Sequence, residues 1–134
     1  MCSSDLSRRE NRCLRFSEYA CKRYGWQCTS IEDLEVKGSY DLVICHDVLQ
    51  YLDNKAATLA IDKLAALTHC ALLFGVLTRE DWQENCDQEL TDGQAYMRTT
   101  EWYRQRLGVH FRNAGGGVFK IGRASCRERV CLAV

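Results

Sequence analysis

The chain has 134 residues, with 18 basic and 18 acidic side chains, nine cysteines and no proline. This length predicts one domain, and 46 % apolar with 27 % charged residues predicts a folded rather than a disordered chain. Zero net charge excludes a nucleic-acid binder driven by phosphate neutralisation. The longest apolar run, residues 70–77, falls far short of the roughly 20 residues of a membrane span. The polar N-terminus lacks a signal core, so a cytoplasmic protein is expected.

The cysteines predict free thiols in a reducing compartment rather than a disulfide scaffold. None is arranged as C-x-x-C, the usual half of a structural zinc site. Two His-Cys neighbours, Cys45–His46 and His69–Cys70, suggest metal ligands at first sight. Because neighbouring residues on a strand point to opposite faces, neither pair is expected to chelate one ion, and no metal site is predicted.

Both ends of the chain resemble translated sequencing adapters, at residues 2–6 and 121–130. We therefore expect residues 1–6 to be an artefactual leader and residues 121–134 an artefactual tail, both poorly packed. The domain is expected to cover residues 7–120, as an internal piece of a longer protein.

Apolar periodicity and capping residues predict the elements of that domain. In chain order they are a helix at 17–24, an extended segment at 26–30, a strand at 40–45, a helix at 55–68, a strand at 71–76, helices at 78–85 and 100–107, and strands at 109–113 and 117–120. Asp53 or Asn54, Thr78, and Thr99 or Thr100 are the expected N-caps. The runs 40–45 and 71–76 are continuously apolar, which is typical of strands buried on both faces.

The alternation of strand and helix predicts an α/β fold with a mostly parallel sheet. The two last strands, joined by residues 114–117, predict an antiparallel hairpin at its edge. The glycines of this connection predict a turn and not a phosphate loop, because no helix N-terminus follows them.

Ligands of open α/β sheets bind beyond the carboxyl ends of the strands. This rule selects the residues after the short strand, Ser30 and Ile31, those after residues 40–45, and residues 78–81. His46 is the candidate general base, since imidazole changes charge near neutral pH; the alternative is a hydrogen-bonded loop residue. Asp47 is expected to cap the turn that follows it.

Four segments carry a resemblance to class I S-adenosyl-L-methionine-dependent methyltransferases. They are residues 40–53 (YDLVICHDVLQYLD), similar to the strand-four motif, residues 16–20 and 30–34, similar to the regions after strands two and three, and residues 70–87, similar to strand five and its extension in one bacterial subgroup. The similarity covers about residues 13–120. It implies a Rossmann-like sheet, S-adenosyl-L-methionine as cofactor and a small-molecule substrate.

The resemblance also implies where the cofactor lies. Ser30 and the Ile31 backbone would flank the adenine, and Cys45 and His46 would lie near the methionine portion. The family's glycine-rich loop after the first strand has no counterpart in the sequence, and Arg15 occupies the position of the acidic residue that binds the ribose hydroxyls. The expectation is therefore a methyltransferase fragment, truncated at the N-terminus and inactive as given.

The aromatic and charged segment 77–111 leaves a second interpretation open. It forms a wall of a substrate site, or it packs against the domain. In the alternative reading, the chain is a catalytically dead α/β module that binds a protein partner through this segment. A dehydrogenase ranks third, because the chain contains no G-x-G-x-x-G motif.

Overall fold

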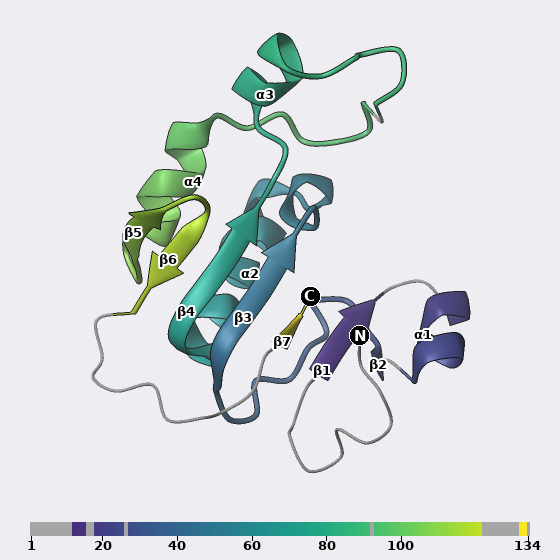
Figure 1. The fold of residues 1–134 in the computed structure, drawn as a ribbon, viewed down its shortest axis with the longest axis vertical. Coiled ribbons are helices and arrows are strands. Elements are labelled where there is room, and N and C mark those ends of the chain that lie inside the picture. Colours follow the sequence, from purple (N-terminus) through teal and green to yellow (C-terminus); the bar gives the residue numbers. More distant parts are fainter. Residues whose placement is uncertain (1–11, 16–17, 26, 92, 122–131, 134) are drawn as a thin grey trace.

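The strands of the described chain form one mixed sheet with helices beside it (Figure 1). The computed structural model describes residues 12–15, 18–25, 27–91, 93–121 and 132–133. Along the sheet the strand order is β2-β1-β7-β3-β4-β6-β5. The strands are β1 (Arg12–Arg15), β2 (Gln27–Cys28), β3 (Tyr40–His46), β4 (Thr68–Gly75), β5 (Arg112–Gly115), β6 (Val118–Lys120) and β7 (Leu132–Ala133).

The helices form where the sequence predicts them, because their caps are local. They are α1 (Glu18–Tyr24), the 3-10 turn η2 (Leu49–Tyr51), α2 (Asn54–Leu67), α3 (Arg79–Glu84) and α4 (Thr100–Leu107). The carboxylate of Asp53 accepts a hydrogen bond from the backbone N–H of Ala56 at 2.8 Å. Thr78 and Thr99 cap α3 and α4 in the same way, which satisfies backbone donors that a helix leaves unpaired.

Parallel pairing dominates the sheet, as predicted. β1 with β2, β3 with β4, and β7 with both β1 and β3 are parallel. β6 is antiparallel to β4 and to β5, which confirms the C-terminal hairpin. β5 begins later than expected, because Val109 and His110 continue the turns of α4 through bonds to Arg106 and Leu107 carbonyls. The connection 115–117 has positive φ at all three glycines, so the predicted turn is confirmed.

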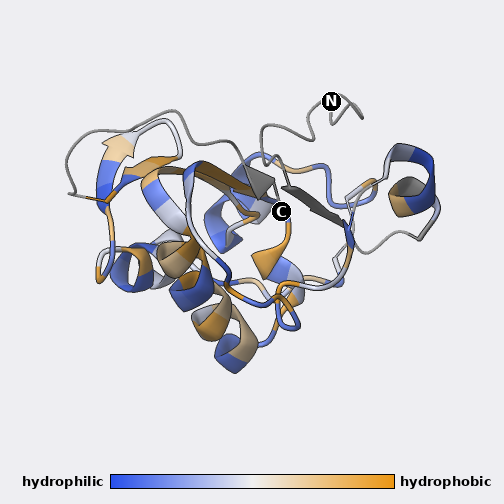
Figure 2. Cartoon of the chain, turned by 90° about the horizontal axis from the view of Figure 1, so that it is seen from below, coloured by the Kyte–Doolittle hydropathy of each residue, from blue (hydrophilic) through white to orange (hydrophobic). Residues whose placement is uncertain are grey.

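One face of the central strands carries the core. Val43, Cys45 and Leu72 are fully buried there, packed with residues of α2 and α4 such as Ile61 and Leu107. Helix α2 lies against β3 and β4 (Figure 1). The helices on this side of the sheet carry both hydrophobic and hydrophilic residues (Figure 2). Each buried leucine side chain of this cluster contributes about 1.5–3 kcal/mol by leaving water.

The other face of β3 and β4 is partly open, which corrects the expectation of strands buried on both faces. Burial alternates along β4 and, from Val43 onward, along β3, and Leu42 is 37 % exposed. Among the described residues, no helix covers this face of β3 and β4 (Figure 1). The continuous apolar runs therefore do not distinguish one covered face from two, because both patterns consist of apolar residues.

The centre of the sheet contains a strand that the sequence did not predict. β7 lies between β1 and β3, with Leu132 paired to Arg12 and Val43, and Ala133 paired to Cys13 and Ile44. These two residues belong to the segment 121–134 that was expected to be an artefactual tail; their backbone pairs within the sheet, and the expectation for the segment as a whole stays a prediction. The backbone groups of β1 and β3 require hydrogen-bond partners, and β7 provides them. Residues 1–6 lie outside the described residues, and the boundaries of the domain stay a prediction.

Candidate functional site

The carboxyl end of β3 presents a histidine and an aspartate in contact. The Nδ1 atom of His46 lies 2.7 Å from Oδ2 of Asp47, and both side chains are more than half exposed. Asp47 is not the cap that the sequence predicts, because the turn η2 has Val48 as its N-cap and no side-chain cap bond. Its carboxylate instead pairs with the histidine.

Asp47 has a backbone conformation that few residues other than glycine adopt. Its φ is 55°, in the left-handed region, which aspartate tolerates better than most residues but at a cost of about 1–3 kcal/mol. A hydrogen bond of 3.0 Å from its backbone N–H to the Gly75 carbonyl holds this turn against β4.

Gly75 is necessary for the position of the histidine ring. A Cβ atom at Gly75 would lie 2.3 Å from Cδ2 and 2.5 Å from Nε2 of His46, far inside contact distance. The imidazole therefore lies directly over the backbone at the end of β4. Only a residue without a side chain permits this contact.

Gln50 connects Asp47 to the chain that follows β4. It is 3 % exposed, and its Nε2 donates to Oδ1 of Asp47 at 3.2 Å. Its Oε1 accepts a hydrogen bond from the backbone N–H of Leu77 at 3.4 Å. The backbone carbonyl of Gln50 accepts a hydrogen bond from the backbone N–H of Tyr96 at 2.7 Å. The histidine, the aspartate and the segment after β4 are thus one connected group.

Cys45 does not present its thiol at this edge. The side chain is fully buried on the helix-covered face of β3. Burial, and secondarily the charge of Asp47, raises the pKa of the Cys45 thiol to about 12. The thiol stays protonated near neutral pH, and a ligand at the edge can contact only the backbone of this residue.

Ser30 and Ile31 follow β2, three positions along the sheet from β3. With strands about 4.8 Å apart, the two strand ends are separated by about 14 Å, so only an elongated ligand could contact both. The Ile31 side chain is 3 % exposed and part of the core. The hydroxyl of Ser30 donates to Asp33 Oδ2 at 2.9 Å.

Lys63 holds the loop after β2 against α2. Its ammonium donates to the carbonyl of Ile31 at 3.1 Å, and to that of Glu32. The sequence analysis missed this residue, because the two partners are 32 and 31 positions away in the chain.

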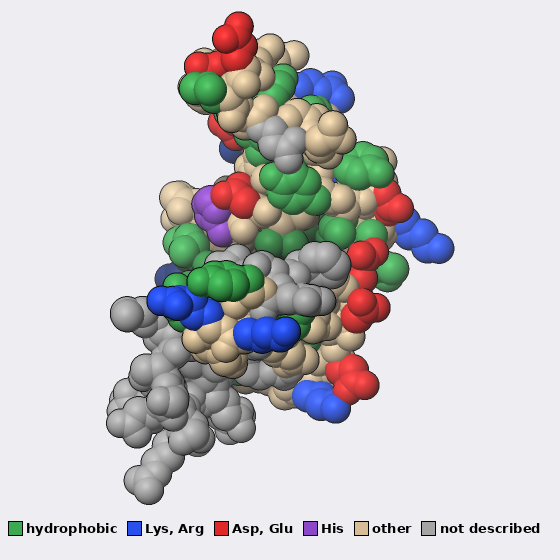
Figure 3. Space-filling model, turned by 90° about the vertical axis from the view of Figure 1, so that its right-hand side faces the viewer, with side chains coloured by type: hydrophobic (Ala, Val, Ile, Leu, Met, Phe, Trp, Pro, Cys, Tyr) green, Lys and Arg blue, Asp and Glu red, His purple; other side chains and the backbone are tan. Residues whose placement is uncertain are grey.

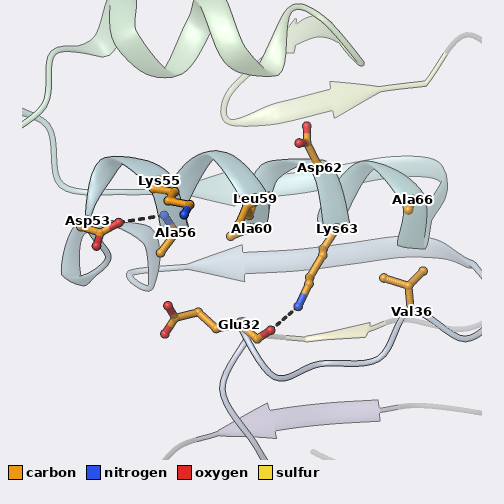
Figure 4. A pocket seen from close by; sticks show the side chains of 10 residues that line it. All are labelled: Glu32, Val36, Asp53, Lys55, Ala56, Leu59, Ala60, Asp62, Lys63 and Ala66. Carbon is orange, nitrogen blue, oxygen red and sulfur yellow. Dashed lines mark hydrogen bonds between the residues drawn. The ribbon is translucent and has the colours of Figure 1, made fainter.

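A cavity of about 490 Å³ lies between this loop and the exposed side of α2 (Figure 4). Lys63 crosses it toward Glu32, and small apolar side chains of α2 form its floor (Figure 4). None of the predicted site residues lines it. The cavity therefore adjoins the loop after β2 and not the His46–Asp47 pair.

The segment after β4 is attached to the domain by a buried arginine. Arg98 is 6 % exposed, and its guanidinium donates to the carbonyls of Leu49 and Leu52, to Asn54 Oδ1 and to the Tyr103 hydroxyl. The guanidinium carbon also lies 4.7 Å from the ring centre of Trp102.

The aromatic side chains near Arg98 are thus mostly engaged within the domain. Tyr103 is 3 % exposed, and burial, opposed by the hydrogen bond from Arg98, raises the pKa of its hydroxyl. Tyr96 remains half exposed and Leu90 almost fully exposed. Packing thus accounts for the part of the segment around Arg98 and Tyr103, whereas α3 buries no residue, so a role of the segment in binding a substrate or a protein partner stays a prediction.

Asp41, His69 and Cys70 bring their potential ligand atoms within 4.8 Å of one another at the opposite end of the sheet. The expectation that neighbouring strand residues cannot approach one ion is therefore wrong for His69 and Cys70, which lie where the register of β3 and β4 shifts. Cys70 is disulfide-bonded, contrary to the expected free thiols, and a disulfide sulfur is not a thiolate ligand. The absence of a metal site therefore stays a prediction.

Charged side chains of both signs are interspersed on the face of the molecule shown in Figure 3, with no basic stripe among the described residues there. This distribution agrees with the zero net charge of the chain and offers no phosphate-binding track on that face. None of the helices in the described part of the chain is long and apolar enough to cross a membrane.

Comparison with known proteins identifies the fold. No protein-family model and no curated protein matches the sequence. A solved structure does match: the N-methyltransferase NodS from Bradyrhizobium japonicum WM9, in complex with S-adenosyl-L-homocysteine. The TM-score is 0.63 at 15 % sequence identity, over 85 % of this chain and 68 % of NodS. The chain therefore has the Rossmann-like fold of class I methyltransferases.

Proposed function

We propose that this chain belongs to an S-adenosyl-L-methionine-dependent methyltransferase that acts on a small molecule. The similarity to NodS, whose structure contains S-adenosyl-L-homocysteine, is the observation that carries the proposal. The parallel pairs that connect β2 to β3 leave the end of β3 and the loop after β2 on the same edge of the sheet, where α/β proteins bind nucleotides.

The described residues fit one part of the cofactor. The loop 29–34, held to α2 by Lys63, is suited to the adenine side, and the backbone of Cys45 with the exposed His46 is suited to the sulfur side. None of the described connections from a strand to a helix is a glycine-rich loop, and Arg15 ends β1 where a ribose-binding carboxylate is expected. We therefore expect weak binding and no turnover from the chain as given.

Methyl transfer from a sulfonium requires mainly alignment of donor and acceptor. The residues of this chain contribute by binding and orienting the reactants. His46 contributes chemically only if the acceptor must lose a proton.

Titration of the ¹⁵N-labelled chain with S-adenosyl-L-homocysteine tests the proposal. We expect backbone NMR shifts confined to residues 29–34 and 45–47, with a dissociation constant of about 1 mM or weaker, equivalent to about 4 kcal/mol. NAD⁺ is the control ligand and tests the dehydrogenase alternative. The proposal fails if the shifts are absent at about 5 mM, lie elsewhere, or are reproduced equally by NAD⁺.

A substitution in β1 sharpens this test. Arg15→Glu introduces the carboxylate that the ribose hydroxyls require, and one hydrogen bond to a charged group contributes about 1.5–3 kcal/mol. We expect tighter binding by tenfold or more. Arg12→Glu, at the other end of the same strand, makes the same charge change and should leave affinity unaltered. Equal effects of the two substitutions would indicate nonspecific electrostatics.

A further inference from the structure

Two histidine–aspartate contacts lie in the described part of the chain, and they use different ring nitrogens. His46 contacts Asp47 through Nδ1 at 2.7 Å, whereas His110 contacts Asp62 through Nε2 at 2.8 Å. A neutral imidazole has one N–H and one bare nitrogen, and a carboxylate accepts the N–H. The two histidines are therefore held in opposite tautomers.

In His46 the bare nitrogen is Nε2, on the far side of the ring from Asp47. The ring lies over Gly75, at the edge of the sheet where ligands of α/β folds bind. In His110 the bare nitrogen is Nδ1. That residue is at the end of α4, away from the carboxyl ends of the parallel strands.

Asp47 is itself held in place from two sides. Its backbone N–H donates to Gly75, and Gln50 donates to its second carboxylate oxygen. A left-handed backbone at a residue other than glycine persists only where the surroundings over-determine it. The strained turn after β3 thus fixes the carboxylate that selects the histidine tautomer.

We propose that Asp47 is a positioning residue that keeps Nε2 of His46 available as a proton acceptor for a ligand's hydroxyl or ammonium group. The proton passes from the ligand O–H or N–H to Nε2, and the electron pair of that bond stays on the ligand. The resulting imidazolium is paired with the Asp47 carboxylate. Gln50 supports this arrangement and connects it to the segment after β4. The identity of the ligand as a methyl acceptor rests on the proposed function; the tautomer does not.

The experiment is ¹⁵N–¹H correlation NMR of the imidazole side chains in the ¹⁵N-histidine-labelled chain. At about pH 8.5, above the range in which imidazole ordinarily titrates, we expect His46 with a proton on Nδ1 and His110 with a proton on Nε2. His46→Gln identifies the His46 signals by their loss. A wild-type spectrum with the His46 proton on Nε2 overturns the proposal.

Asp47→Asn is the decisive variant, since asparagine also tolerates a left-handed backbone. Its side-chain amide can donate to Nδ1 instead of accepting from it, so we expect His46 to change to the Nε2–H tautomer. Asp62→Asn is the matched control, and it should alter the signals of His110 alone. An unchanged His46 tautomer in Asp47→Asn also overturns the proposal.

The two proposals can fail separately. If S-adenosyl-L-homocysteine binds at the carboxyl edge but His46 has the other tautomer, only the role of Asp47 is wrong. If the tautomers are as expected but the cofactor product does not bind, the methyltransferase proposal fails and the proton-accepting pair remains.

Discussion

Replacing Arg98 by methionine tests whether this side chain attaches the segment after β4 to the domain. Methionine keeps the length and apolar character of the side chain and removes every donor. In the wild type, Nη1 donates to the Leu49 carbonyl and to the Tyr103 hydroxyl, both at 3.0 Å, and both bonds are buried. Nε donates to Asn54 Oδ1 at 2.7 Å in a partly buried position.

The expected loss follows from these contacts. A buried acceptor that loses its donor costs about 1–3 kcal/mol, although the Leu49 carbonyl keeps a bond from the Leu52 N–H. Water reaches Asn54 in the variant, so that acceptor contributes little. The contact with Trp102 adds about 0.5–1 kcal/mol. We expect the free energy of unfolding to fall by about 3 kcal/mol, a substantial part of the stability of a small domain.

Urea denaturation followed by tryptophan fluorescence measures this loss. With a slope of about 1–3 kcal/mol/M, the midpoint should fall by about 1–3 M. Arg104→Met is the matched control, because Arg104 lies on the same helix as Trp102 but is exposed. Its effect should stay within about 0.5 kcal/mol. A loss below about 1 kcal/mol in Arg98→Met, or equal losses in both variants, would refute the reasoning.

Three further predictions concern the edge of the sheet and the pH dependence of stability. Gly75→Ala should displace the ring of His46 and abolish its Nδ1–H signal in the imidazole spectrum, while the free energy of unfolding changes by less than about 1 kcal/mol, because the displaced contact between His46 and Asp47 is exposed. Burial raises the pKa of the Cys45 thiol from 9.0 to about 12, so the thiol should resist alkylation at about pH 9 until the chain unfolds. Above pH 9 the free energy of unfolding should fall by up to about 1.4 kcal/mol per pH unit, because the unfolded chain loses the thiol proton first. Cys45→Ala should remove this pH dependence in urea titrations. Hydrogen bonds from its own backbone N–H and from Thr100 lower the pKa of Glu80 from 4.5, so its stabilisation should be present above that pH and lost as the pH falls, and Glu80→Gln should flatten the acid side of the stability profile; an unchanged profile would contradict this.

The sequence determines the features of this domain that depend on a few neighbouring residues. The N-cap of α2 joins Asp53 to Ala56, three residues away, and the caps of α3 and α4 have the same spacing. The turn 115–117 follows from glycine's tolerance of positive φ. The α/β class and the hairpin could be predicted because they result from the order of such local elements.

Only the tertiary structure decides which strands are neighbours and which side chains meet. Residues 132–133 lie between β1 and β3 because unpaired strand edges need partners, and nothing in their own sequence predicts this. Within the site, the exposed imidazole after β3 could be predicted, but its contact with Gly75 depends on the register of β3 against β4. Gln50 reaches Leu77 across 27 residues and Arg98 reaches Leu49 across 49. Contacts at such separations depend on chain topology, which local periodicity and capping do not encode.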